Sequence, residues 1–269
     1  MNVSRRAEGR YAPVRTECGG YVRAVQERLL PAIKPLTARS VALSTLLGYH
    51  PPALPVSALV RVGGLFGIAE RTTRVALTRM VRDGDVVAEN GVYRLTERLV
   101  RRQVQQDESG SPQSRNWSGS WEMAVVTAPA RTLAERVSLR KSMVSYRLAE
   151  LREGIWTRPD NLLREFDGAV ADQCMFFVSQ YKDSAELVAQ LWDLPAWAAE
   201  ARRLCTALEK ADTLVDGFMA TAEVLRHLLL DPYLPSELLP ADWPGTELRE
   251  RYAEFIKTYA ERLRDYGEG

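Results

Sequence analysis

The dipeptide Asn90-Gly91 lies between two short strand-like arms in the segment VVAENGVYRLT. Asparagine and glycine tolerate the positive φ angles that a type I′ turn requires, so the segment predicts a tight β-hairpin. A helix is predicted directly before it, from Glu70 to Asp83. The hairpin is therefore expected to lie beside this helix.

Two further helices are predicted upstream, in ARSVALSTLLGYH and PVSALVRVGG, and the turn GLFGIA follows them. After the hairpin, ERLVRRQVQQ is helical in pattern and QDESGSPQSRN is a polar linker. The order of helix, helix, turn, basic helix and hairpin is that of a winged helix-turn-helix, a DNA-binding arrangement in which the last helix enters the major groove.

The helix over 70–83 has two contrasting faces. Its apolar face, at the spacing i, i+3, i+4 and i+7, consists of Thr73, Ala76, Leu77 and Met80. The candidate DNA-binding residues are those of the other face and one on the hairpin: Arg71, Thr72, Arg74, Val75, Thr78, Arg79, Arg82 and Arg94. Arginine binds guanine edges or phosphates, and a valine methyl can contact thymine. The alternative is a solvated amphipathic helix, since arginine is also a good surface helix former.

Charge is unevenly distributed along the 269 residues, although the net charge is only +1. Residues 1–120 hold 18 basic and 10 acidic side chains, whereas residues 121–269 hold 18 and 25. This asymmetry favours an N-terminal part that binds a polyanion. Chance, together with a mobile basic arm at residues 1–35, would also produce it.

The rest of the chain divides into two blocks. In the first, WEMAVVTAPA and CMFFVSQ are typical of buried strands, GIWTRP of a shorter strand, and TLAERVSLRKSMVSYRLAELR of a helix. The second block is helical, interrupted by the prolines of DPYLPSELLPADWPG. The predicted fold is α+β and multidomain: arm 1–35, winged helix-turn-helix 36–106, linker 107–116, central domain 117–183 and helical C-terminal domain 184–269.

A small-molecule effector site has weaker support in the sequence. Residues 131–158 carry a local net charge of +4 that could bind phosphates, and several tryptophans could form the walls of an aromatic pocket. The candidate effector residues are Arg136, Arg140, Lys141, Trp156, Arg158, Trp192, Trp197, Arg226 and His227. Solvated helix faces and ordinary core packing explain the same residues.

Several segments resemble the PaaX family of repressors of phenylacetic acid catabolism. ARSVALSTLLGYH, ALVRVGGLFGIAERTTRVALTRMVRDG and YRLTE are similar to its N-terminal domain, GIWTRPDNL to its central domain, and LLLDPYLPSELLPADWPG to its C-terminal signature. The family often has an aromatic residue where Asp85-Val86 stands here. The resemblance implies a ferredoxin-like, Cas2-like central fold. It also implies a homodimeric repressor of double-stranded operator DNA, released by an aryl-acyl coenzyme A thioester such as phenylacetyl-CoA.

Other classes of function have less support. A Cas2-like nuclease needs carboxylates at the end of its first strand, yet no acidic residue occurs between Glu122 and Glu135. The three cysteines and two histidines are widely spaced, so no metal site, cofactor or catalytic centre is expected. A winged-helix scaffold for protein contacts stays open as an alternative.

Without an apolar run long enough to span a membrane, or a secretory signal, the chain is expected to be cytoplasmic. We expect the C-terminal helices to form the dimer contact.

Overall fold

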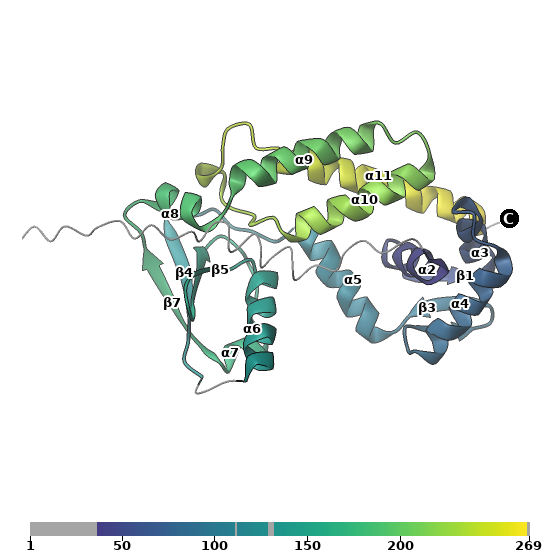
Figure 1. Cartoon of the computed structure of the whole chain (residues 1–269), viewed down its shortest axis with the longest axis horizontal. Coiled ribbons are helices and arrows are strands. Elements are labelled where there is room, and N and C mark those ends of the chain that lie inside the picture. The colour runs from purple at the N-terminus through teal and green to yellow at the C-terminus, as the bar shows by residue number, and fades with distance from the viewer. Residues whose placement is uncertain (1–36, 111, 129–131, 268–269) are drawn as a thin grey trace, which may run out of the picture.

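The structure is a computed structural model that describes residues 37–110, 112–128 and 132–267 (Figure 1). The arm predicted over 1–35 lies outside these ranges. The fold is α+β, as predicted, with two antiparallel sheets of three and four strands. Among the described residues, no helix is long and apolar enough to cross a membrane.

Three helices begin the described chain: α2 (Ala38–Leu47), α3 (Val56–Leu65) and α4 (Glu70–Arg82). All three were predicted. The side chains of Thr37 and Ser40 form a capping box that starts α2. Gly63 lies where α3 meets α4, since a Cβ added there would be only 2.5 Å from Oγ1 of Thr73. The missing side chain is therefore what allows the two helices to approach this closely.

The predicted hairpin is confirmed. It consists of β2 (Val86–Glu89) and β3 (Val92–Leu95), joined by Asn90 and Gly91 with φ angles of 50° and 79°. A strand that the sequence did not indicate, β1 (Ala53–Pro55), pairs with β3 and gives the order β1-β3-β2. Three residues, one of them a proline, are too few to show a strand's alternation.

Helix α5 (Glu97–Gly110) follows the hairpin and is longer than predicted. It continues four residues into the segment expected to be a linker over 107–116. Beyond it the chain is also structured, because Ser114 forms a bridge with Leu162 and the Arg115 N–H donates to the carbonyl of Asn161 at 2.9 Å. Part of the segment predicted to be a linker is therefore helical, and Ser114 and Arg115 contact the central block.

The central block contains β4 (Ser120–Val126), α6 (Leu133–Ser145), β5 (Ala149–Arg152), β6 (Ile155–Pro159), α7 (Gly168–Ala171) and β7 (Cys174–Gln180). The sheet order is β5-β6-β4-β7, and β-α-β-β-α-β is the element order of ferredoxin-like motifs. The helix predicted through Arg152 ends at Ser145 instead. Arg147 has a φ of 62°, a left-handed conformation that ends the helix, and β5 follows.

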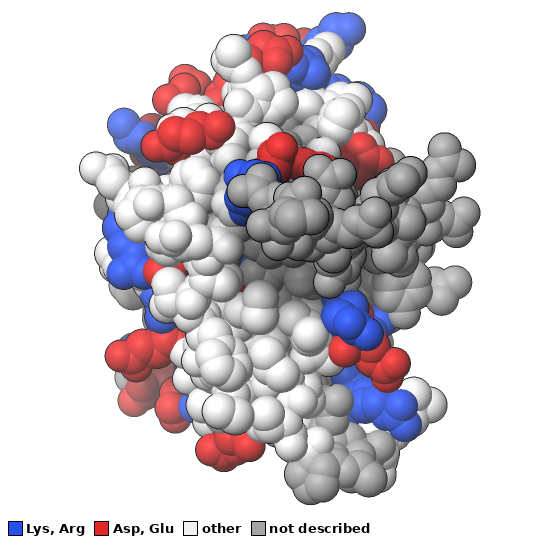
Figure 2. Space-filling model, turned by 90° about the vertical axis from the view of Figure 1, so that its left-hand side faces the viewer, with Lys and Arg blue, Asp and Glu red and all other residues white. Residues whose placement is uncertain are grey.

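Strand β7 was predicted to be buried, and this was wrong. It is an edge strand that pairs only with β4, and most of its side chains are exposed. Its large apolar residues and the tyrosine that follows are Met175, Phe176, Phe177, Val178 and Tyr181. Figure 2 shows a broad uncharged area on this side of the molecule, with charged side chains mostly at its margins.

The C-terminal block is helical, as predicted: α8 (Ser184–Leu191), α9 (Leu194–Glu209), α10 (Leu214–Leu229), the 3-10 turn η1 (Ser236–Leu238) and α11 (Gly245–Gly267). Helices α10 and α11 also pack on the N-terminal block (Figure 1). Phe218 and Tyr259 belong to that block's hydrophobic core. The Tyr259 hydroxyl lies 3.0 Å from Oγ1 of Thr45, and the rings of Phe218 and Phe66 are 5.0 Å apart.

Candidate nucleic-acid interface

Helix α4 is oriented as its pattern predicted. Thr73, Leu77 and Met80 are buried against the N-terminal core, and Ala76 is half-buried at the edge of that face. The inward face is what fixes the helix, because each full turn places another side chain in the same core. The remaining side chains are consequently held outward.

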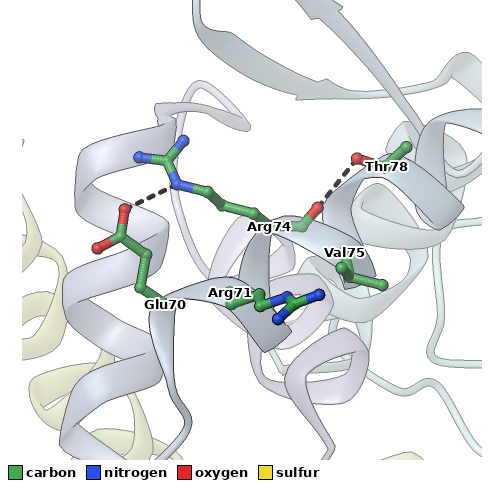
Figure 3. A pocket seen from close by; sticks show the side chains of 5 residues that line it. All are labelled: Glu70, Arg71, Arg74, Val75 and Thr78. Carbon is green, nitrogen blue, oxygen red and sulfur yellow. Dashed lines mark hydrogen bonds and ion pairs between the residues drawn. The ribbon is translucent and has the colours of Figure 1, made fainter.

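All candidate DNA-binding residues are exposed. Five residues line a shallow hollow on the outer face of α4: Glu70, Arg71, Arg74, Val75 and Thr78 (Figure 3). Val75 is 43% exposed, which is high for a large apolar side chain. The Thr78 hydroxyl donates to the carbonyl of Arg74 at 3.0 Å. A surface with guanidinium, hydroxyl and methyl groups side by side has the chemistry that reads base edges.

The arginines of this surface differ in their partners. Arg74 pairs with Glu70 at 2.7 Å, Arg82 with Asp83 at 3.2 Å, and Arg94 on β3 with Glu89 at 3.6 Å. These pairs are exposed, so each contributes little to stability.

Arg71 and Arg79 form no ion pair with any residue that the structure describes. Their guanidinium groups are therefore open to an anionic partner on every side that the described carboxylates could have taken.

Asp85 joins the hairpin to the helices, a role that its sequence context did not predict. Its carboxylate is buried and accepts hydrogen bonds from Arg39 of α2 at 3.0 Å and Arg98 of α5 at 2.7 Å. The Thr96 hydroxyl donates to the Gly84 carbonyl at 2.9 Å beside it. A network of charged side chains is therefore found at the position where the family that this sequence resembles often has an aromatic residue. The available signal was the acidic residue directly before Val86-Val87, the start of the predicted hairpin.

The candidate effector residues do not come together. Arg136 and Lys141 are exposed on α6, whereas Arg140 pairs with Glu150 at 2.6 Å and lies 5.8 Å from the Trp156 ring, which is buried under the same helix.

Arg158 is fully buried and serves the structure. Its guanidinium donates to the carbonyls of Pro232 and Tyr233, each at 3.2 Å, and to Oδ1 of Asn161 at 2.6 Å. Burial lowers its pKa, with the nearby Arg164 adding to the effect. Arg147 donates to the carbonyl of Asp231, and burial lowers its pKa to about 10. These arginines bind the carbonyls that follow α10, where the helix dipole is negative.

Trp197 and His227 lie in the core between the C-terminal helices. Their rings stack with centroids 4.4 Å apart, and the ring of Trp243 also stacks on Trp197, with centroids 4.6 Å apart. Nε2 of His227 is 2.9 Å from the Trp197 carbonyl, and burial lowers the pKa of the imidazole. Arg226 is half-buried beside it.

Trp192 lines a separate apolar hollow between α8 and η1, with Val188, Leu194, Leu238 and Leu239. The predicted effector residues thus fall into distinct hydrophobic clusters, and no single pocket contains them all.

The residues that the structure describes contain no group of three metal-binding side chains. Glu122 on β4 is bound by Arg164 at 2.6 Å and lies 3.4 Å from Arg158. A carboxylate held by two guanidiniums is poorly placed to bind a cation, so Glu122 gives no support to nuclease chemistry.

Comparisons with known proteins agree with these blocks. The chain matches the family model of the PaaX-like protein over residues 37–99, of the PaaX central Cas2-like domain over 114–187, and of the PaaX-like C-terminal domain over 180–268. The solved structure of an uncharacterized Mycobacterium tuberculosis protein, Rv0674, is similar with a TM-score of 0.78 and 44% identity. That match covers 86% of this chain and 99% of that chain. A search of curated proteins found no match.

Proposed function

The chain belongs to the PaaX family, whose members are generally transcriptional regulators rather than enzymes, and we propose that it is a repressor that reads operator DNA with α4. The observation that carries this proposal is the outward face of α4, where exposed Arg71 and Arg74 line the same hollow as Val75 and Thr78 (Figure 3). The packing of Thr73, Leu77 and Met80 holds that face away from the core. Such a helix suits the major groove.

We assign the N-terminal block as a winged helix-turn-helix. Helices α3 and α4 supply the helix pair, and the β2–β3 hairpin that follows supplies the wing. Asp85 fixes the root of this wing through Arg39 and Arg98, so the hairpin is held in a defined position relative to α4. Arg94 on the wing would contact backbone phosphate.

We propose that the protein binds a palindromic operator as a homodimer, because one recognition helix buries too little to be selective by itself. The sequence led us to expect the dimer contact in the C-terminal helices. However, the large exposed apolar residues among those described include none from 184–262, whereas β7 and the residue after it supply five. We therefore place the contact at the free edge of β7.

Edge β7 suits a second copy of the same chain. Its sequence CMFFVSQ has no charge, proline or glycine to prevent strand pairing, and antiparallel pairing about a two-fold axis is self-complementary. Five partly exposed large side chains leave on the order of 500 Å² of apolar surface, the size of the largest patch on a typical monomer, and such patches often bind a partner. Two copies that buried all of this surface would together bury about 1,000 Å², the lower limit for a specific interface.

The family resemblance motivates one further element of the proposal, release of the operator by an aryl-acyl coenzyme A thioester. The ligand must bind the DNA-incompetent arrangement more tightly than the DNA-bound one. The apolar hollow at Trp192 is one place for an aryl group.

Calorimetric titration with phenylacetyl-CoA should give heat, and the same ligand should release bound DNA. Absence of both effects across several aryl-acyl thioesters would remove the effector from the proposal.

Arg71→Ala tests the readout by α4. Arg71 is exposed and lies near the start of the helix, the part that reaches base edges. Its loss should weaken binding to the operator by about 1–3 kcal/mol and relax base choice at one position. Fluorescence anisotropy on the operator, selected from a random duplex library, and on a scrambled duplex measures both effects. Unchanged operator affinity would contradict readout by Arg71.

A further inference from the structure

Glu70 is an unexpected residue on a surface assigned to DNA. It lies at the first position of α4, in the same hollow as Arg71, Arg74, Val75 and Thr78 (Figure 3). A carboxylate facing DNA repels phosphate and so lowers affinity for every sequence. Its position therefore needs a reason that outweighs this cost.

The geometry of its ion pair supplies that reason. Oε1 of Glu70 accepts from Nε of Arg74 at 2.7 Å, and both side chains are about half exposed. Among the described residues, neither terminal nitrogen of Arg74 donates a hydrogen bond. A guanidinium held at Nε keeps these two nitrogens available as a fork, the group that binds O6 and N7 of guanine together.

We propose that Glu70 is a positioning residue for sequence readout: it orients Arg74 so that the guanidinium reads a guanine instead of contacting phosphate. This inference rests on the proposed function of α4. It extends that function by naming the base and the residue that makes the contact selective. Pre-orientation also lowers the side-chain entropy lost when Arg74 binds, because the free rotamers have already been restricted.

A simpler role for Glu70 makes a different prediction. An acidic side chain in the first turn stabilises a helix through its dipole. If that were its whole role, substitution would lower stability and leave base preference unchanged. If it were only a repelling charge, its removal would strengthen binding to all DNA equally.

The test uses in vitro selection from a random duplex library with the full-length parent, Glu70→Ala, Glu70→Gln and Glu89→Ala. Glu70→Ala should lose a guanine preference at one position and bind the parent's operator about tenfold more weakly, without losing affinity for scrambled DNA. Glu70→Gln keeps an oxygen that can accept from Nε, so it should retain the preference.

Glu89→Ala is the matched control, because Glu89 pairs with Arg94 on the wing in a similarly exposed site. It should strengthen binding to operator and scrambled DNA alike and leave base preference unchanged.

The inference is overturned if Glu70→Ala selects the parent's motif with the same guanine preference, or if it merely strengthens binding to all duplexes as Glu89→Ala does. Equal loss of preference in Glu70→Gln and Glu70→Ala would also overturn it. These results differ from failure of the proposed function itself, in which the parent protein would select no motif at all.

Discussion

At the scale of single residues, the α4 surface divides into cations with and without a carboxylate partner. The sequence predicted that Arg71, Arg74 and Arg79 would be exposed, and they are. It did not show that Arg74 pairs with Glu70 while Arg71 and Arg79 lack such a partner among the described residues. Helical periodicity determines the face on which a side chain lies, but pairing depends on rotamers that periodicity does not specify.

Arg94→Ala separates phosphate contact from base readout. Arg94 is exposed on β3, the strand assigned to the wing. Its loss should weaken binding to operator and to scrambled DNA about equally. It should also reduce the slope of log affinity against log salt concentration by about one unit. Anisotropy titrations from low to high salt measure this slope. A loss confined to the operator would mean that Arg94 reads bases.

Because His227 is buried, we expect the free energy of unfolding to depend on pH. Burial holds its folded-state pKa below the ordinary value of 6.5, so the unfolded chain takes up a proton at a higher pH than the folded protein does. The stabilising contribution is therefore complete above pH 6.5 and is lost as the pH falls towards the folded-state pKa. The resulting slope is at most about 1.4 kcal/mol per pH unit.

Urea unfolding of the parent and of His227→Gln between pH 7.5 and 5 measures this contribution. The variant should be less stable at pH 7.5 and should lose less stability on acidification. The exposed His50 provides the control, His50→Gln, in which the His227 step should persist. Parallel pH profiles for the parent and His227→Gln would contradict the assignment.

At the scale of elements, the strongest local signals gave the correct structure. Asn90-Gly91 predicted the hairpin because the positive φ angles of its turn are a local property of those two residues. Strand β5 was missed because Ala149–Arg152 is compatible with a helix, and only a short turn at residues 146–148, with Arg147 left-handed, separates it from α6. The exposure of β7 was also missed, because an apolar run does not reveal whether a neighbour covers it.

The contact between α3 and α4 depends on one of two adjacent glycines. Gly63→Ala should lower the free energy of unfolding by about 1–3 kcal/mol, because the new Cβ meets Thr73 and the helices must separate. Gly64→Ala is the matched control: it has open space around it, and alanine favours a helix by roughly 0.5–1 kcal/mol. Urea denaturation compares the two. Equal effects would show that the close approach at Gly63 is unimportant.

At the scale of the whole molecule, the sequence predicted three blocks but not how they are joined. The described contacts place Phe218 and Tyr259 in the N-terminal core, and they place Arg158 of the central block against the carbonyls of Pro232 and Tyr233. Both junctions bring together residues far apart in the chain. Local patterns do not report such pairings, which is why Tyr259 and Arg158 could not be assigned from sequence.

Val178→Lys tests the proposed dimer. Val178 is 73% exposed on β7, so the substitution should leave the fold intact, while like charges brought together across a two-fold axis should separate the copies. Light scattering should show a dimer for the parent and a monomer for the variant. Val104→Lys, which replaces a valine 49% exposed on α5, should stay dimeric. A monomeric parent at operator-binding concentration, or a dimeric Val178→Lys, would contradict the β7 interface.

The burial of Tyr259 among N-terminal residues has a consequence for how the protein is made. Thr45 and Phe66 are synthesised early, yet their partners Tyr259 and Phe218 leave the ribosome much later. The helix pair that carries the arginines therefore cannot complete its hydrophobic core while translation is under way. An unfinished chain would lack the support that holds α3 and α4, so nascent fragments should not compete with the finished protein for its binding sites.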